Sequence, residues 1–216
     1  MRNMADLLIL NILTLLCFLP IITIGPSLCA LFSLTLKIAR DEPVETVRMF
    51  FSALKRNFFQ GIILGSIAIF AAIVIAADGI YAFSLEGKLR IVFCIVTGIV
   101  LAVWMTYVCY VFALQARYEN TVIGQIRNAF MLAFVSPLQT ILMWLILAAP
   151  VLLFLLLPEY VVIYTGVFWL LFGVSLPALG ISSVLRKIFE RFDKGQDQDS
   201  GSGIQDSGDR EQGAVN

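Results

Sequence analysis

Long uncharged apolar stretches constrain this chain more than any other feature of its sequence. Five of them are long enough to cross a bilayer as a helix, which takes about 20 residues. Apolar residues make up 60% of the chain and charged residues 14%, whereas soluble domains are about 45–50% apolar and about 25% charged. A globule of this size has too little interior to bury that excess. The stretches cover residues 7–36, 58–77, 91–114, 129–157 and 160–185.

These stretches predict an all-α fold, a polytopic transmembrane helical bundle of about five spans within residues 1–192. The expected surroundings are a lipid bilayer, because the spans have no other apolar phase in which to lie. This class excludes a soluble enzyme and a free nucleic-acid-binding protein, so we expect no nucleic acid partner.

Lysine and arginine indicate the orientation, since they gather in the short loops on the cytoplasmic side. If all five stretches cross the membrane, eleven basic residues lie on one side, in segments 37–56, 117–127 and 186–194, with the distal Arg210 left aside. The other side has three, Arg2, Lys88 and Arg90. The sequence therefore predicts a cytoplasmic C-terminus and an N-terminus on the opposite side.

The first stretch contains helix-breaking residues in its middle. As one helix, its thirty residues would measure about 45 Å, which exceeds the hydrocarbon core of about 30 Å. Pro20 and Pro26 each remove a helix hydrogen bond, and Gly25 lies between them. We expect two half-helices, neither long enough to span the membrane alone. A re-entrant hairpin with the N-terminus inside is the alternative to a broken span.

This break is also the candidate polar site of the membrane domain. A broken helix exposes amide and carbonyl groups that protein or cavity water must satisfy, and in transporters such half-helix ends hold polar substrates. The alternative is a structural kink that neighbouring helices fill. The candidate residues are Pro20, Thr23, Gly25, Pro26 and Ser27.

Groups that carry chemistry are scarce. The five stretches contain no Asp, Glu, Lys or Arg, and the chain has no histidine. Its four cysteines form no CxxC pair. Proton relays and membrane catalysis depend on intramembrane ionisable groups, and metal sites need clustered ligands. The sequence therefore predicts a protein that is not an enzyme and that binds no cofactor or metal.

Small residues mark two helix-packing faces. Gly61 and Gly65 form a GxxxG pair, and three glycines recur every seven residues in the last stretch. Such patterns let helix backbones approach closely. Packing within the chain is the default interpretation, and a homo-oligomer contact is the alternative. The three glycines of the last stretch are Gly166, Gly173 and Gly180.

Residues 41–60 have the pattern of an amphipathic helix. Apolar residues follow at steps of three or four, with basic residues largely off that stripe. Such a basic helix lies naturally along the inner leaflet, and it is also suited to docking on another protein. The candidate surface consists of Val47, Phe51, Leu54, Lys55 and Phe58.

The C-terminal segment, residues 193–216, differs from the rest of the chain. It contains six acidic and two basic residues and is rich in Gly, Ser and Gln. Such a composition buries too little apolar surface to fold. The sequence predicts a disordered acidic tail.

Two groups of motifs resemble the YesL-like family of bacterial membrane proteins, over about residues 5–65. The first runs from Asn11 through Leu19–Ser27 to Lys37 and Arg40. The second contains the Phe50-Phe51 pair, Lys55-Arg56-Asn57-Phe58 and Gln60. The later stretches resemble that family by their layout alone.

The resemblance implies an accessory role in carbohydrate uptake, in the plasma membrane of a bacterium and beside subunits of a binding-protein-dependent sugar importer. It implies no catalytic residues. The chain has no Glu-Ala-Ala-type permease motif, which argues against its being the sugar permease itself. The alternative hypothesis is a small autonomous transporter or channel for a neutral polar solute, working through the broken first helix.

Overall fold

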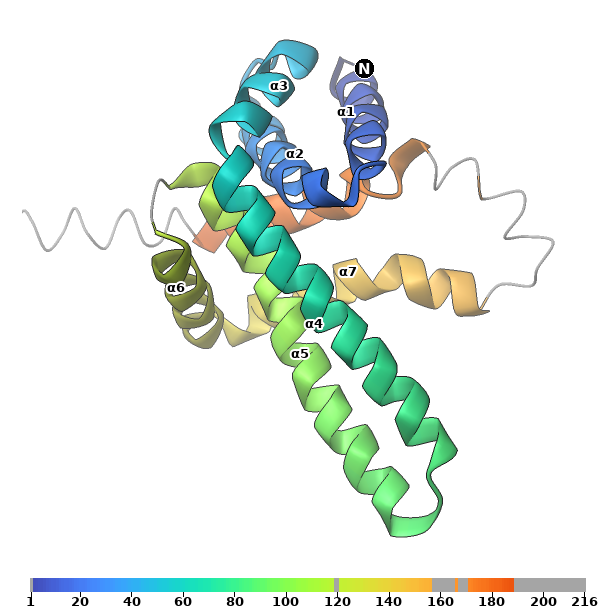
Figure 1. The fold of residues 1–216 in the computed structure, drawn as a ribbon. Helices are drawn as coiled ribbons and strands as arrows, with labels where there is room; N and C mark the ends of the chain where they lie inside the picture. The colour runs from blue at the N-terminus through green and yellow to red at the C-terminus, as the bar shows by residue number, and fades with distance from the viewer. Residues whose placement is uncertain (1, 119–120, 157–165, 167–170, 189–216) are drawn as a thin grey trace, which may run out of the picture.

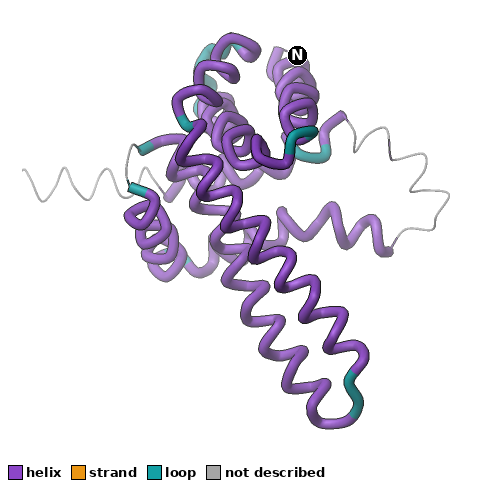
Figure 2. Tube along the Cα trace, viewed as in Figure 1, coloured by secondary structure: helices purple, strands orange, loops and turns teal. Residues whose placement is uncertain are grey.

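A computed structural model describes residues 2–118, 121–156, 166 and 171–188, and within these ranges it contains helices and no strand (Figure 2). This confirms the predicted all-α bundle. A further helix covers residues 175–188. The labelled elements are α1 (Arg2–Phe18), a short 3₁₀ turn η1 (Ile21–Thr23), α2 (Ile24–Ala39), α3 (Thr46–Arg56), α4 (Phe58–Ser84), α5 (Gly87–Arg117), α6 (Val122–Val135) and α7 (Pro137–Leu156).

Three of the described helices are long and apolar enough to cross a membrane, Ile21–Ala39, Phe58–Ala82 and Gly87–Arg117. A fourth span results if the bent pair α6–α7 is counted as one. The expected span 160–185 lies partly, and the predicted tail 193–216 wholly, outside the described residues. The apolar helices imply a bilayer environment. The second half of the first stretch is long enough to span alone, contrary to our expectation.

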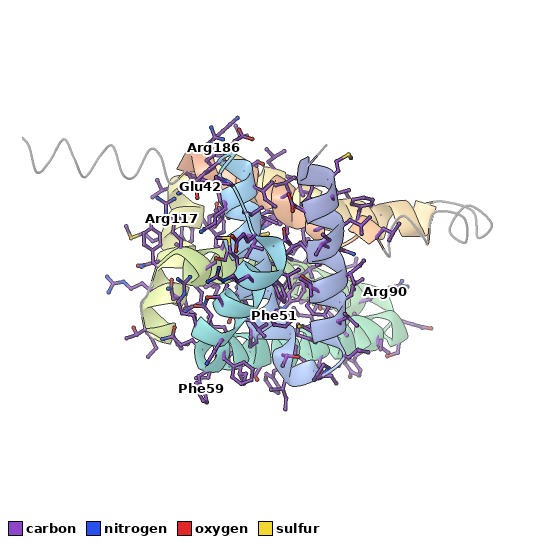
Figure 3. All side chains as sticks on the ribbon, turned by 90° about the horizontal axis from the view of Figure 1, so that it is seen from above. Glu42, Phe51, Phe59, Arg90, Arg117 and Arg186 are labelled. Carbon is purple, nitrogen blue, oxygen red and sulfur yellow. The ribbon has the colours of Figure 1, made fainter. Side chains whose placement is uncertain are left out.

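The first stretch folds back on itself. Figures 1 and 3 show α1 and α2 side by side in opposite directions, joined through η1. The Thr46 hydroxyl donates to Asp6 Oδ1 at 2.7 Å, so the beginning of α1 lies beside the beginning of α3. The N-terminus and the basic segment after α2 therefore lie at the same end, as in the hairpin alternative and unlike a single broken span.

Helices α4 and α5 form a long antiparallel hairpin, which is the lower arm in Figure 1. With 27 and 31 residues, they measure about 40 and 46 Å. Gly87, which starts α5, has a φ of 69°, a left-handed conformation that glycine adopts at no steric cost. Two side chains of α5 hold it against α4. Trp104 Nε1 donates a hydrogen bond to the Ala68 carbonyl, and the Tyr107 hydroxyl donates one to the Leu64 carbonyl, both at 2.9 Å.

The expected span 129–157 does not form one straight helix, and it counts as a span only if α6 and α7 are taken together as a bent pair. The chain bends by 108° between α6 and α7, and the break falls at Ser136, whose φ of −128° and ψ of 62° are not helical. Proline has no N–H and disfavours a helical conformation in the residue before it. Pro137 therefore ends α6 at Val135 and begins α7.

The core lies where α2 packs against α4 and the C-terminal half of α5. Tyr110, Phe112 and Leu31 are fully buried there. In contrast, apolar side chains farther along the α4–α5 hairpin are exposed, such as Phe70 (70%) and Ile80 (74%). Exposed apolar surface of this extent is stable in lipid and not in water.

Candidate functional site

The predicted helix break packs directly against the predicted GxxxG pair. A Cβ built on Gly25 would overlap the Gly61 carbonyl oxygen. A Cβ on Gly61 would lie 2.7 Å from Pro26 Cα, and one on Gly65 would lie 2.7 Å from Gly25 Cα. Real carbon atoms pack at about 3.5–4.0 Å. The beginning of α2 and the first two turns of α4 thus form a close backbone contact, which we call the glycine joint (Gly25, Pro26, Gly61 and Gly65).

The hydroxyl groups near the break bond to their own chain. The Thr23 hydroxyl contacts the carbonyl oxygens of Pro20, at 2.7 Å, and of Cys17. The Ser27 hydroxyl donates to the Ile24 carbonyl at 2.8 Å. Gly25, Pro26 and Ser27 are buried, whereas Pro20 is exposed. The five break residues therefore do not converge on one polar centre, and three of them are enclosed by protein.

Asn11 of α1 caps a helix near the other end of the chain. Its side-chain oxygen accepts the N–H groups of Val174 and Ser175, both at 3.0 Å, where the helix over residues 175–188 begins. The first N–H groups of a helix have no partner within it, and Asn11 is fully buried. No local pattern could have predicted a cap supplied from more than 160 residues away.

Two further contacts hold the same helix against α2. The Thr35 and Ser182 hydroxyls lie 2.8 Å apart, and Arg186 Nη1 donates to the Ala39 carbonyl at 2.5 Å. The second contact gives one of the unpaired carbonyls at the end of α2 a charged donor. The α1–α2 hairpin therefore positions the helix over residues 175–188 along its length.

The glycines of the last predicted stretch do not share one continuous helix. A turn at residues 173–174 separates Gly166 from the helix that carries Gly180. A Cβ on Gly166 would have no neighbour within 4 Å, whereas a Cβ on Gly180 would lie 3.2 Å from Ile146 Cγ2 in α7. The close helix contact at Gly180 therefore lies within the chain. The homo-oligomer contact stays a prediction.

Helix α3 has two apolar faces where the sequence indicated one. Phe50 and Ala53 are buried against the bundle at 0% and 6% exposure, whereas Val47 and Phe51 are 51% and 49% exposed. Leu54 packs against the edge of the core. Lys55 is exposed, and Phe58 is partly buried as the first residue of α4. The sequence pattern missed the anchoring role of Phe50, because Phe51 beside it fitted the same periodicity.

A cleft lined by basic residues lies at the junction of α2, α3 and α5. It has two neighbouring parts of about 360 and 190 Å³, and Ser33, Lys37 and Arg56 line both. We call it the basic cleft. Figure 3 shows Glu42 and Arg117, from its second part, near Arg186 and well apart from Arg90. The charged residues that line it are Lys37, Arg40, Arg48, Arg56 and Arg117, with Glu42 and Glu45.

A buried amide cluster lies next to this cleft. Gln115 Nε2 donates to Asn57 Oδ1 at 3.2 Å and also contacts Gln60 Oε1. Gln115 and Asn57 are 3% and 4% exposed. Arg56 Nη2 lies 3.5 Å from the Ala116 carbonyl at the end of α5. Neutral amides therefore fix the junction of α3, α4 and α5 next to the two cleft residues Arg56 and Arg117.

An apolar groove of about 440 Å³ lies between α5, α6 and α7, with Val103, Phe134 and Trp144 in its walls. Its shape follows from the bend at Pro137. Within the described ranges no group of three or more His, Cys, Asp or Glu side chains is placed to hold a metal ion. Cys29 and Cys109 are buried, Cys17 is partly buried, and Cys94 is exposed.

A comparison with protein families finds a match in the N-terminal part of the chain. A family model described as a protein of unknown function, DUF624, matches residues 7–79, about a third of the chain. The matched part runs from α1 into α4 and contains the glycine joint and Asn11. No curated protein and no solved structure matches the chain.

Proposed function

We propose that this chain is a non-enzymatic accessory protein of the bacterial plasma membrane that binds a subunit of a sugar importer through the outer face of α3. The observation that carries the proposal is the exposed apolar pair Val47 and Phe51 beside the exposed cations Arg48 and Lys55. Phe50 anchors the opposite face of the same helix. The carbohydrate-uptake context comes from the resemblance described above.

The proposed orientation places the basic cleft and both ends of the α1–α2 hairpin in the cytoplasm. With the α1–α2 hairpin, Arg2 lies on the same side as the eleven basic residues counted above. Lys88 and Arg90 are then the basic residues of the loop on the opposite side. The positive-inside rule favours this arrangement. A cysteine introduced at Lys88 should then be labelled from outside intact cells by a membrane-impermeant reagent, and one introduced at Glu42 should not. The reverse labelling would refute the orientation.

The glycine joint also bears on the transporter hypothesis. A substrate site at the break needs room at Gly25 and Ser27, and Gly25 has no space even for a methyl group. The accessory function therefore has the better physical support.

The deciding experiment is purification of the tagged full-length chain from its native host in a mild detergent, followed by mass spectrometry of co-purifying proteins. Stoichiometric recovery of importer subunits is the expected result. Phe51→Asp should abolish their recovery because it places a charge in an apolar contact, whereas Phe51→Leu should retain it. Recovery of the chain alone, or equal recovery with Phe51→Asp, would refute the proposal.

A further inference from the structure

We infer that the basic cleft binds the phosphate of an anionic phospholipid headgroup. Five cations and two carboxylates line it. Six of these residues lie between Lys37 and Arg56, in α2, α3 and the segment that joins them, and folding adds Arg117 from the end of α5. Basic pockets between transmembrane helices on the cytoplasmic side are suited to such headgroups.

The carboxylates neutralise only part of this charge. Glu42 lies 3.8 Å from Arg40, and Glu45 lies 3.5 Å from Arg48. The side chain of Glu45 is 71% exposed and that of Arg48 is 86% exposed. Solvent-exposed pairs of this kind interact weakly. Within the described part of the chain, Lys37 and Arg56 have no carboxylate within ion-pair distance. These two residues also line both parts of the cleft.

Two helix ends contribute negative potential to the same place. Helices α2 and α5 end at Ala39 and Arg117, and each C-terminus is equivalent to about half a negative charge. The lining nevertheless stays net positive, because the cations exceed the carboxylates by three. An anion that enters the cleft is therefore attracted, and Arg56 can offer it the fork of N–H donors that matches phosphate oxygens.

The level of the cleft relative to the membrane favours a lipid over a soluble phosphate. Lys37 directly follows the first uncharged stretch, Arg56 precedes the second by two residues, and Arg117 follows the third by three. The cleft therefore lies where three apolar segments give way to charge, which is the level of the headgroups. A phospholipid held there keeps its acyl chains along the apolar helices, whereas a soluble phosphate gains no such contact.

The test uses the full-length protein in nanodiscs of equal parts phosphatidylcholine and phosphatidylglycerol. The lipids that remain bound after transfer to detergent are counted by native mass spectrometry. The wild-type protein should retain phosphatidylglycerol in preference to phosphatidylcholine. Lys37→Gln and Arg56→Gln should each lower this preference about fivefold, the effect of one cation near an anionic lipid surface. Lys37→Arg should preserve it.

The matched control is Lys88→Gln, which removes one exposed cation at the opposite end of the α4–α5 hairpin. It should leave the preference unchanged. An equal loss for Lys88→Gln and Lys37→Gln would mean general attraction by surface charge and would overturn the site. Unfolding temperatures measured in phosphatidylcholine alone show whether each variant is folded, so that misfolding is not taken for lost binding.

A second arm separates the two sources of phosphate. Inorganic phosphate and glycerol 3-phosphate are added to the protein in nanodiscs of phosphatidylcholine alone, and the unfolding temperature is measured. Neither should stabilise the protein as much as phosphatidylglycerol does. Equal stabilisation by either soluble compound, lost in Arg56→Gln, would assign the cleft to a soluble phosphate and overturn the lipid assignment.

Discussion

The glycine joint gives the sharpest prediction for the fold. In Gly61→Ala the new Cβ would lie 2.7 Å from Pro26 Cα, and in Gly65→Ala it would lie 2.7 Å from Gly25 Cα. Ordinary carbon contacts lie at about 3.5–4.0 Å, so α2 and α4 must separate by about 1 Å. No rotamer change can relieve the overlap because the neighbouring atoms belong to the backbone.

Overpacking of this kind costs about 1–3 kcal/mol. For a chain of this size, 1 kcal/mol lowers the unfolding temperature by about 2–4 °C, so the two variants should unfold about 2–12 °C below their control. A suitable assay follows a thiol-reactive dye in detergent. Cys29 and Cys109 are 0% exposed and react only when the bundle opens.

Replacing glycine by alanine within a helix is itself stabilising by about 0.5–1 kcal/mol, so the control variants must carry the same replacement. Gly79→Ala and Gly98→Ala provide it, since a Cβ at either position has no neighbour within 4 Å. Both should be as stable as the wild type or more stable. If Gly61→Ala and Gly65→Ala matched these controls, α2 and α4 would not be in backbone contact, and the reasoning would fail.

Three further predictions use the same unfolding assay. Phe50→Ala should cost about 3–5 kcal/mol because Phe50 is fully buried, and Phe51→Ala much less because Phe51 is 49% exposed; equal losses would contradict the orientation of α3. Asn11→Leu leaves the first amides of the helix over residues 175–188 without their acceptor, so it should cost about 1–3 kcal/mol and speed their hydrogen exchange; unchanged protection would rule out the cap. Trp104→Phe removes a hydrogen bond to a carbonyl of α4 and should cost only about 0.6 kcal/mol. A loss of several kcal/mol in the free energy of unfolding would contradict this small contribution of the hydrogen bond.

The sequence could predict features that depend on neighbouring residues. Uncharged stretches of sufficient length indicated membrane helices, and Pro20 with Gly25 and Pro26 placed the break in the first stretch where α1 ends and α2 begins. The size of the bend at Pro137, which is 108°, could not be predicted in the same way. A proline within a long apolar stretch is compatible with either a mild kink or a full break, and the packing of the surrounding helices selects between them.

The residues of the candidate sites could be predicted separately, but their contacts with one another could not. The sequence offered the helix break as a polar site and Gly61 with Gly65 as a packing face. The structure joins the two in one contact. The basic residues were counted for topology, and folding gathers five of them into the basic cleft. The glycine joint has no signal in a single sequence, because α2 and α4 contribute residues about 35 positions apart. The basic segment 37–56 was visible, but its pairing with Arg117 was not.

The amino-acid sequence was sufficient to predict membrane helices whose apolar stretches carry no charge. Hydropathy and the need to satisfy backbone hydrogen bonds act residue by residue, so composition and spacing suffice for these conclusions. The hairpin in the first stretch and the cap that Asn11 provides for the helix over residues 175–188 became visible only in the folded chain. Such contacts depend on which surfaces meet in space, and a close fit between distant backbones is a property of the folded chain alone.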